Sequence, residues 1–189
     1  MLAQAIFTPR STLPRVSPTS LRSDLDPNVL STDAGLKYFP PEREAAWFGL
    51  LSAHAELTRG LDACLSAKHG LTLSAYEVLS RLAHAEDGHL RMSELAAKSQ
   101  LSLSRVSRVV DALEARGVAA RNSCAVDSRV VHATITPAGQ ALLSAAQDTF
   151  FETVESRFLG RLSCDEVGLL GDIFGRLVEA GPPADRAAE

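Results

Sequence analysis

The sequence predicts a mainly α-helical protein with a small antiparallel β-hairpin near the middle of the chain. Apolar residues recur at helical spacing in both the N-terminal and the C-terminal parts, and their period shortens to that of a strand after Gly117. The length of 189 residues favours one domain with at most a small appendage. No stretch approaches the roughly 20 apolar residues of a membrane helix, so we expect no membrane partner.

Residues 1–38 are expected to form a disordered N-terminal tail. Pro, Ser and Thr are frequent here, and the segment shows no sustained apolar periodicity. Arg10 interrupts the apolar run too early for a secretory signal. We interpret the segment as a mobile extension or a misassigned start, and the alternative is a basic arm that touches nucleic acid.

One long amphipathic helix is predicted over residues 39–70. Pro41 with Glu42 and Glu44 marks its start, because acidic groups suit the positive end of the helix dipole. Gly70 marks its end. Its apolar stripe comprises Trp47, Leu50, Leu51, His54, Leu57, Leu61, Cys64 and Leu65.

Two further helices are predicted over residues 137–181, followed by a short tail over 182–189. Thr136 is an N-cap followed by Pro137 in the first turn, and Ser163 with Glu166 forms a capping box. The apolar stripes of these helices comprise Leu142, Leu143, Ala146, Phe150, Val154 and Phe158, and then Val167, Leu170, Phe174, Leu177 and Val178.

The flanking helices carry more apolar surface than the about 65 residues between them can cover. A partner surface is therefore expected, and a two-fold homodimer is the commonest solution. The alternative is a compact monomeric bundle. In the dimer interpretation, residues 39–70 and 137–181 are dimerisation helices.

Residues 71–136 are predicted to form a separate lobe. Thr72 or Ser74 caps its first helix, and residues 90–92 read as one short strand. Ser93 is expected to cap a short helix over residues 94–99.

A second, more basic helix is predicted to begin at Ser102 and end at Gly117. Two short helices joined by a tight turn are typical of a helix-turn-helix, whose second helix enters the DNA major groove. The outward residues of this second helix are Ser102, Ser104, Arg105, Ser107 and Arg108. Small hydroxyls approach phosphates and base edges closely, and Arg pairs with guanine or clamps a phosphate. The plain alternative is the polar face that any amphipathic helix shows to solvent.

A β-hairpin is predicted after this helix, with strands over residues 118–121 and 129–135. Such a hairpin after a helix-turn-helix is called a wing. Arg121 and Arg129 lie at its base and rim, and Asp127 is placed to orient Arg129 through an ion pair. All three are candidate DNA-site residues.

Charge is unevenly distributed along the chain, whose formal net charge is −4. Residues 91–131 carry net +3, whereas residues 39–90 carry −3 and residues 132–189 carry −5. A uniformly basic coat for nucleic acid is excluded. The segment charges instead predict a positive lobe between acidic flanking helices.

The lobe resembles that of the MarR family of bacterial transcription regulators. The segments that carry this resemblance, in matching order and spacing, are residues 91–96, 101–117, 121, 127–129 and 135–139. The resemblance extends from about residue 42 to 180. The sequence departs from the family at residues 118–120, where bulkier apolar residues are usual.

The resemblance implies a winged helix-turn-helix lobe inserted between N- and C-terminal dimerisation helices. Such homodimers bind a pseudo-palindromic operator in double-stranded DNA, with Arg129 in the minor groove, and often repress. A small aromatic or drug-like effector commonly relieves them. By this resemblance, Trp47 and His54 lie near the effector pocket, although both also suit the core or the dimer interface.

Other functions receive less support from the sequence. The three cysteines form no CxxC and indicate a reducing cytoplasm, and no metal or other cofactor is expected. A redox- or metal-responsive regulator of the same fold is the alternative, with Cys124 beside Arg121 as the thiol to consider. No GxGxxG, P-loop, HExxH or GxSxG motif is present, so we expect no enzyme. A protein-interaction module is disfavoured by Arg105, Arg108 and Arg129.

Overall fold

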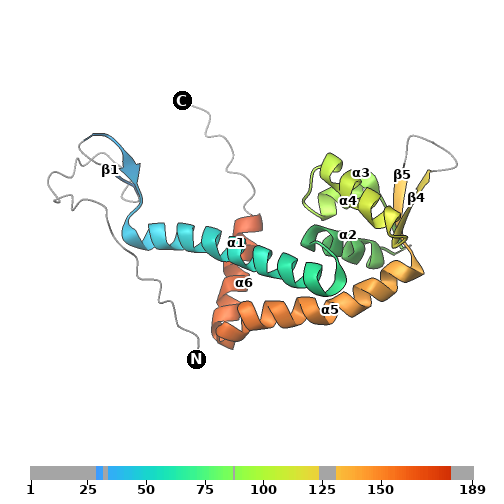
Figure 1. Cartoon of the computed structure of the whole chain (residues 1–189). Coiled ribbons are helices and arrows are strands. Elements are labelled where there is room, and N and C mark those ends of the chain that lie inside the picture. The colour runs from blue at the N-terminus through green and yellow to red at the C-terminus, as the bar shows by residue number, and fades with distance from the viewer. Residues whose placement is uncertain (1–28, 32–33, 87, 124–130, 180–189) are drawn as a thin grey trace. The chain divides into compact units, whose positions relative to one another are not determined.

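The computed structural model describes residues 29–31, 34–86, 88–123 and 131–179 (Figure 1). They form a mainly helical chain with two small antiparallel sheets. The chain divides into two compact units, Met1–Ser52 and Ala53–Glu189. The boundary falls within the long helix α1 (Pro41–His69). None of the helices in the described part of the chain is long and apolar enough to cross a membrane.

The first unit contains a short hairpin of β1 (Leu30–Ser31) and β2 (Lys37–Tyr38). Leu30 pairs with Tyr38, and Ser31 pairs with Lys37. This hairpin corrects the expectation that residues 1–38 form a disordered tail throughout. Strands of two residues are too short to show a period, and Gly35 supplies the positive φ of +78° within the connection.

Helix α1 begins and ends as predicted. Glu42 and Glu44 lie in its first turn, and the chain leaves the helix at Gly70, whose φ of +62° lies in the left-handed region. In this single chain, α1 buries only Gly60 and Leu65. The N-terminal half of the predicted apolar stripe is exposed in this chain, with Trp47 50% exposed, whereas Leu57, Leu61 and Cys64 are half-buried.

The central lobe lies in the second unit and encloses the hydrophobic core. Its elements are α2 (Leu73–Ala83), β3 (His89–Arg91), α3 (Met92–Lys98), α4 (Leu103–Ala115), β4 (Ala119–Ser123) and β5 (Val131–Ile135). Thr72 rather than Ser74 caps α2, since its side chain accepts a hydrogen bond from the Ala75 N–H at 3.2 Å. The largest fully buried side chains in the lobe are Leu71, Val78, Leu79, Leu82, Leu95, Val106, Val110 and Leu113.

The three-stranded sheet has the order β3-β5-β4, with both pairs antiparallel. Leu90 pairs with Ala133, and Ala119 pairs with Ile135, and these four side chains face the core. The predicted wing is therefore present at its base, although β4 ends at Ser123, two residues beyond the predicted strand.

Helix α3 begins earlier than predicted, and Ser93 is not its cap. The extended Arg91, with φ −60° and ψ 144°, occupies the N-cap position. The carboxylate of Glu94 accepts a hydrogen bond from the Arg91 N–H at 3.2 Å. Because β3 leads directly into α3, the helix starts where the strand ends.

The C-terminal helices are α5 (Pro137–Arg157) and α6 (Cys164–Glu179), joined by the 3-10 turn η1 (Leu159–Arg161). Both predicted caps are confirmed. Thr136 accepts from the Gly139 N–H at 3.1 Å, and the Ser163 N–H donates to Glu166 at 2.8 Å. Helix α6 buries none of its residues within the protomer.

Gly139 is predicted to be essential for packing α5 against the lobe. A Cβ at this position would lie 2.0 Å from the backbone oxygen of Val118 and 2.9 Å from Ile135. We expect Gly139→Ala to destabilise the protein by about 2–3 kcal/mol in denaturant unfolding, because the backbone must shift. In the control Gly168→Ala, the added methyl meets nothing within 4 Å, and equal losses of stability in both variants would contradict the packing.

Candidate nucleic-acid interface

The N-terminus of α4 is built by a four-residue turn that follows α3. Gln100 in this turn adopts a positive φ of 54°, and Ser102 then takes the N-cap position with extended backbone. The Ser102 hydroxyl accepts a hydrogen bond from the Arg105 N–H at 3.3 Å. This turn separates two helices of the lobe, as the helix-turn-helix prediction requires (Figure 1).

The outward face of α4 carries Ser104, Arg105 and Arg108, all exposed. The opposite face buries Val106 and Val110 in the core. Among the residues that the structure describes, Arg108 has no ion-pair partner. A helix N-terminus with two exposed guanidinium groups in its first two turns suits an anionic partner.

Arg105 is held by the first turn of α2. One guanidinium nitrogen donates to the Ser74 hydroxyl at 3.2 Å. Burial raises the pKa of the nearby Glu77 carboxyl, while the charges of Arg81 and Arg105 act in the opposite direction. Sequence reasoning missed this support, because Ser74 and Arg105 are 31 residues apart and no local spacing reveals the contact.

Ser107, predicted on the outward face of the helix, and Arg121, predicted at the base of the wing, are both candidate DNA-site residues, and the structure turns them toward each other. The Arg121 guanidinium donates to Asp111 and to Glu114, each at 2.5 Å. It also donates to the Ser107 carbonyl at 2.9 Å and to the Ser107 hydroxyl at 3.1 Å. The Arg121 N–H donates to Glu114 at 2.7 Å, so both backbone and side chain of β4 are joined to α4.

These bonds favour the charged form of Arg121. Partial burial lowers its pKa, but the hydrogen bonds and negative charges of Asp111 and Glu114 outweigh that effect and raise the pKa above its ordinary value. We refer to Arg121, Asp111, Glu114 and Ser107 as the Arg121 network. This network connects α4 to β4 at the base of the wing.

The C-terminal end of α4 is joined to the end of α1 by Arg116. Its guanidinium donates to the Gly70 carbonyl at 2.7 Å and to the His69 carbonyl at 3.2 Å. These carbonyls belong to the negative end of α1, where a cation is favourable. The His69 ring in turn lies 2.8 Å from the Thr149 hydroxyl of α5.

A surface groove joins the start of α3, the start of α4 and the wing base. Its lining residues are Arg91, Met92, Ser93, Leu103, Ser107, Arg121 and Val131. Arg91 and Ser93 are exposed and were not among the predicted site residues. The sequence indicated only a strand residue at Arg91 and a cap at Ser93, whereas the structure places both in the groove beside α4.

The other predicted site residues lie either outside the described part of the chain or on the exposed surface of α1. Asp127 and Arg129, together with Cys124, lie outside the described residues. Trp47 and His54 are both exposed on α1. Cys64 is half-buried and Cys164 is exposed, and the described ranges contain no group of three or more His, Cys, Asp or Glu that could hold a metal ion.

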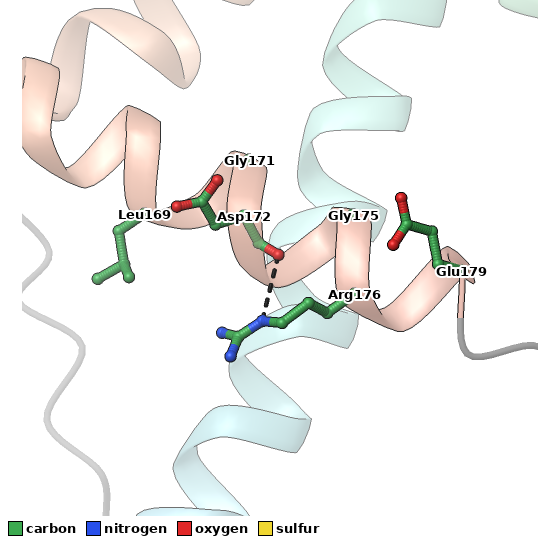
Figure 2. Close-up of a pocket in the computed structure, with 6 residues that line it drawn as sticks. All are labelled: Leu169, Gly171, Asp172, Gly175, Arg176 and Glu179. Atoms are coloured by element: carbon green, nitrogen blue, oxygen red, sulfur yellow. Dashed lines mark hydrogen bonds between the residues drawn. The ribbon is translucent and has the colours of Figure 1, made fainter.

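A second hollow lies along α6 and is lined by Leu169, Gly171, Asp172, Gly175, Arg176 and Glu179 (Figure 2). Arg176 donates from Nε to the Asp172 carbonyl at 3.3 Å within the helix. A Cβ at Gly171 or Gly175 would meet nothing within 4 Å, so the hollow is open.

The fold and the exposed basic helix define a winged helix-turn-helix protein of the DNA-binding class. Comparison with known proteins gives the family. Residues 69–130 match the model of the MarR family. The uncharacterized HTH-type transcriptional regulator YxaD of Bacillus subtilis is 35% identical over 120 residues, covering 64% of this chain and 82% of YxaD.

Solved structures agree with this assignment. The MarR family transcriptional regulator Sco3205 from Streptomyces coelicolor, solved in complex with DNA, matches with a TM-score of 0.73 and 28% identity. The match covers 80% of this chain and 96% of Sco3205. AbsC, a MarR family transcriptional regulator from the same organism, matches with a TM-score of 0.71 and 26% identity, covering 76% and 97%. The chain belongs to the MarR family, whose members are DNA-binding transcriptional regulators rather than enzymes.

Arg121→Met is predicted to destabilise the protein by about 2–3 kcal/mol, because it removes several charged hydrogen bonds and leaves Asp111 and Glu114 without their cationic partner. Denaturant unfolding measures this decrease in stability. Arg161→Met is the matched control, since Arg161 is exposed and donates one bond to the Ser156 carbonyl. A decrease no greater than that of the control would refute the role given to the network.

Proposed function

We propose that this chain regulates transcription as a homodimer that binds a pseudo-palindromic operator and represses the adjacent promoter. The observation that carries the proposal is the rigidly held α4, which exposes Ser104, Arg105 and Arg108 while its other face is buried. In this proposal α4 enters the major groove. The likeness to Sco3205, solved in complex with DNA, supports this mode of binding.

In this proposal, some candidate residues contact DNA and others support the wing. Arg105 and Arg108 contact guanine edges or phosphates, and Ser102 and Ser104 approach the backbone at the helix N-terminus. Arg129, oriented by Asp127, enters the minor groove. Arg121 and Ser107 hold the wing base against α4 instead of binding DNA, because their hydrogen-bonding groups engage each other.

The proposed homodimer is supported by apolar surface that the protomer leaves uncovered. On α6, Leu169 is 58% exposed, Leu177 is 62% exposed and Val178 is 80% exposed. On α1, Trp47, Leu50 and Leu51 are also exposed. Exposed apolar faces of this kind mark interaction surfaces, and a two-fold pair of identical chains buries both copies at once.

We further propose that the bound protein represses its promoter and that a small-molecule effector relieves this repression. The HTH-type transcriptional repressor YetL of Bacillus subtilis is 29% identical over 115 residues, which supports a repressor. Relief by a small aromatic or drug-like effector, with Trp47 and His54 as candidate contacts, follows from the family resemblance.

Arg105→Ala and Arg108→Ala are each predicted to weaken operator binding by about 10- to 100-fold, because a bidentate base contact contributes about 1–3 kcal/mol. Fluorescence anisotropy with an inverted repeat from the DNA flanking the gene measures this. For each phosphate that a variant no longer neutralises, the slope of log K against log salt should become shallower by about 0.9.

The matched control for these variants is Arg161→Ala, an exposed arginine of η1 outside the lobe. All three variants should keep the oligomeric state of the wild type. Unchanged affinity for both α4 variants would remove α4 from the DNA interface.

The double variant Leu177→Glu with Val178→Glu is predicted to shift the protein from dimer to monomer. Two charges placed on a formerly apolar face, and repeated by the two-fold axis, should weaken dimerisation by at least about 100-fold. Sedimentation velocity measures the oligomeric state. Glu179→Gln on the same helix is the control, and a dimer that survives the double variant would place the interface elsewhere.

A further inference from the structure

The outer face of the three-stranded sheet brings together two histidines from different strands. In the antiparallel register His89 of β3 pairs with Thr134 of β5, and Arg91 pairs with His132. Paired residues point to the same face, and so do residues two apart along a strand. His89 and His132 are therefore diagonal neighbours, and their ring centroids lie 5.2 Å apart with an interplanar angle of 80°.

These two rings line a surface hollow together with Asn122 and Thr134. The Asn122 amide nitrogen donates to the Thr134 hydroxyl at 3.2 Å. This bond uses the donor end of the amide and fixes the side chain beside the imidazoles. Among the lining residues that the structure describes, His89 and His132 offer imidazole nitrogens, and Asn122 and Thr134 offer neutral oxygens.

We propose that His89 and His132 form a binding site for a divalent transition-metal ion of the zinc, nickel and copper class. Imidazole nitrogen suits these ions, whereas calcium and magnesium require several carboxylate or carbonyl oxygens. Water completes the coordination, and the amide oxygen of Asn122 is placed to bind or orient that water. Zinc is the first probe.

The spacing of the rings fits a shared ion. Two imidazoles bound to one tetrahedral ion at metal–nitrogen distances of about 2.0–2.1 Å have centroids roughly 5 Å apart. The centroid separation of 5.2 Å therefore matches that of two imidazoles on a shared ion. The antiparallel pairing of β3 with β5 keeps the two histidines as diagonal neighbours.

The surrounding charge limits the affinity. Arg91 is the cross-strand partner of His132, and its guanidinium opposes a second cation on this face. We expect a site that binds more weakly than a structural zinc centre with four protein ligands. A bound ion would connect β3, which leads into α3, to β5, which leads from the wing to α5.

Isothermal titration of the tag-free, full-length protein with zinc tests the proposal. The wild type should bind one ion per chain through these histidines. Exchange of either His89 or His132 for alanine should weaken that binding by more than about tenfold. His54→Ala and His84→Ala, which alter exposed histidines on α1 and after α2, should leave it unchanged. Zinc bound by cysteine thiols would be unaffected by the histidine substitutions, so the difference in zinc binding between each variant and the wild type reports on this site alone.

Thermal unfolding with and without zinc gives a second measurement. Zinc should raise the melting temperature of the wild type, and the rise should disappear in His89→Ala. His89 is exposed, so this variant keeps the test valid even where His132→Ala fails to fold. Zinc binding that survives both substitutions, or no binding by the wild type, would overturn the proposal. Neither result tests DNA binding by α4, which the Arg105 and Arg108 variants test separately.

Discussion

The Arg121 network is the interaction on which the arrangement of the lobe depends. One guanidinium joins β4 to two carboxylates and to a backbone carbonyl of α4. A helix in the major groove and a wing at the neighbouring groove can bind together only if the angle between them is fixed. Apolar packing of Val106 and Val110 holds α4 in the lobe, but such packing is non-directional, whereas charged hydrogen bonds have a defined geometry.

The same network explains how an acidic chain presents a basic surface. The segment 91–131 is only moderately positive, and α4 itself contains the acidic residues Asp111 and Glu114. Arg121 forms ion pairs with both carboxylates and offsets one of their two negative charges within the lobe. Arg105 and Arg108 therefore dominate the exposed start of α4, while Glu77 moderates Arg105 from α2. The position of each charge matters more here than the net charge of −4.

Helix α4 is also tied to the long helices outside the lobe. Arg116 connects its C-terminal end to the last carbonyls of α1, and His69 connects that turn to α5. Both helices belong to the regions that we propose form the dimer. A few hydrogen bonds would therefore transmit a movement of α1 or α5 to α4, and the effector that we propose could act on DNA binding through them.

The prediction from sequence succeeded where the signal is local. Caps at Thr72, Ser102, Thr136 and Ser163 were recognisable because a capping side chain bonds a backbone group three residues away. It failed at Ser93, where the competing start of α3 at the end of β3 decided the boundary. It also failed for residues 30–38, where a two-residue strand has no detectable period.

The sequence by itself determined the helices, the hairpin, their order and the family. Periodicity, caps and motif spacing express interactions between residues close in the chain, and these are largely independent of the rest of the fold. Only the tertiary structure decided what the polar residues do. It gives Arg121 hydrogen bonds that connect β4 to α4, gives Arg105 a hydrogen bond to Ser74, and places the ring of His89 beside that of His132. Such partners are brought together by packing over long separations, and no short-range pattern in the sequence records them.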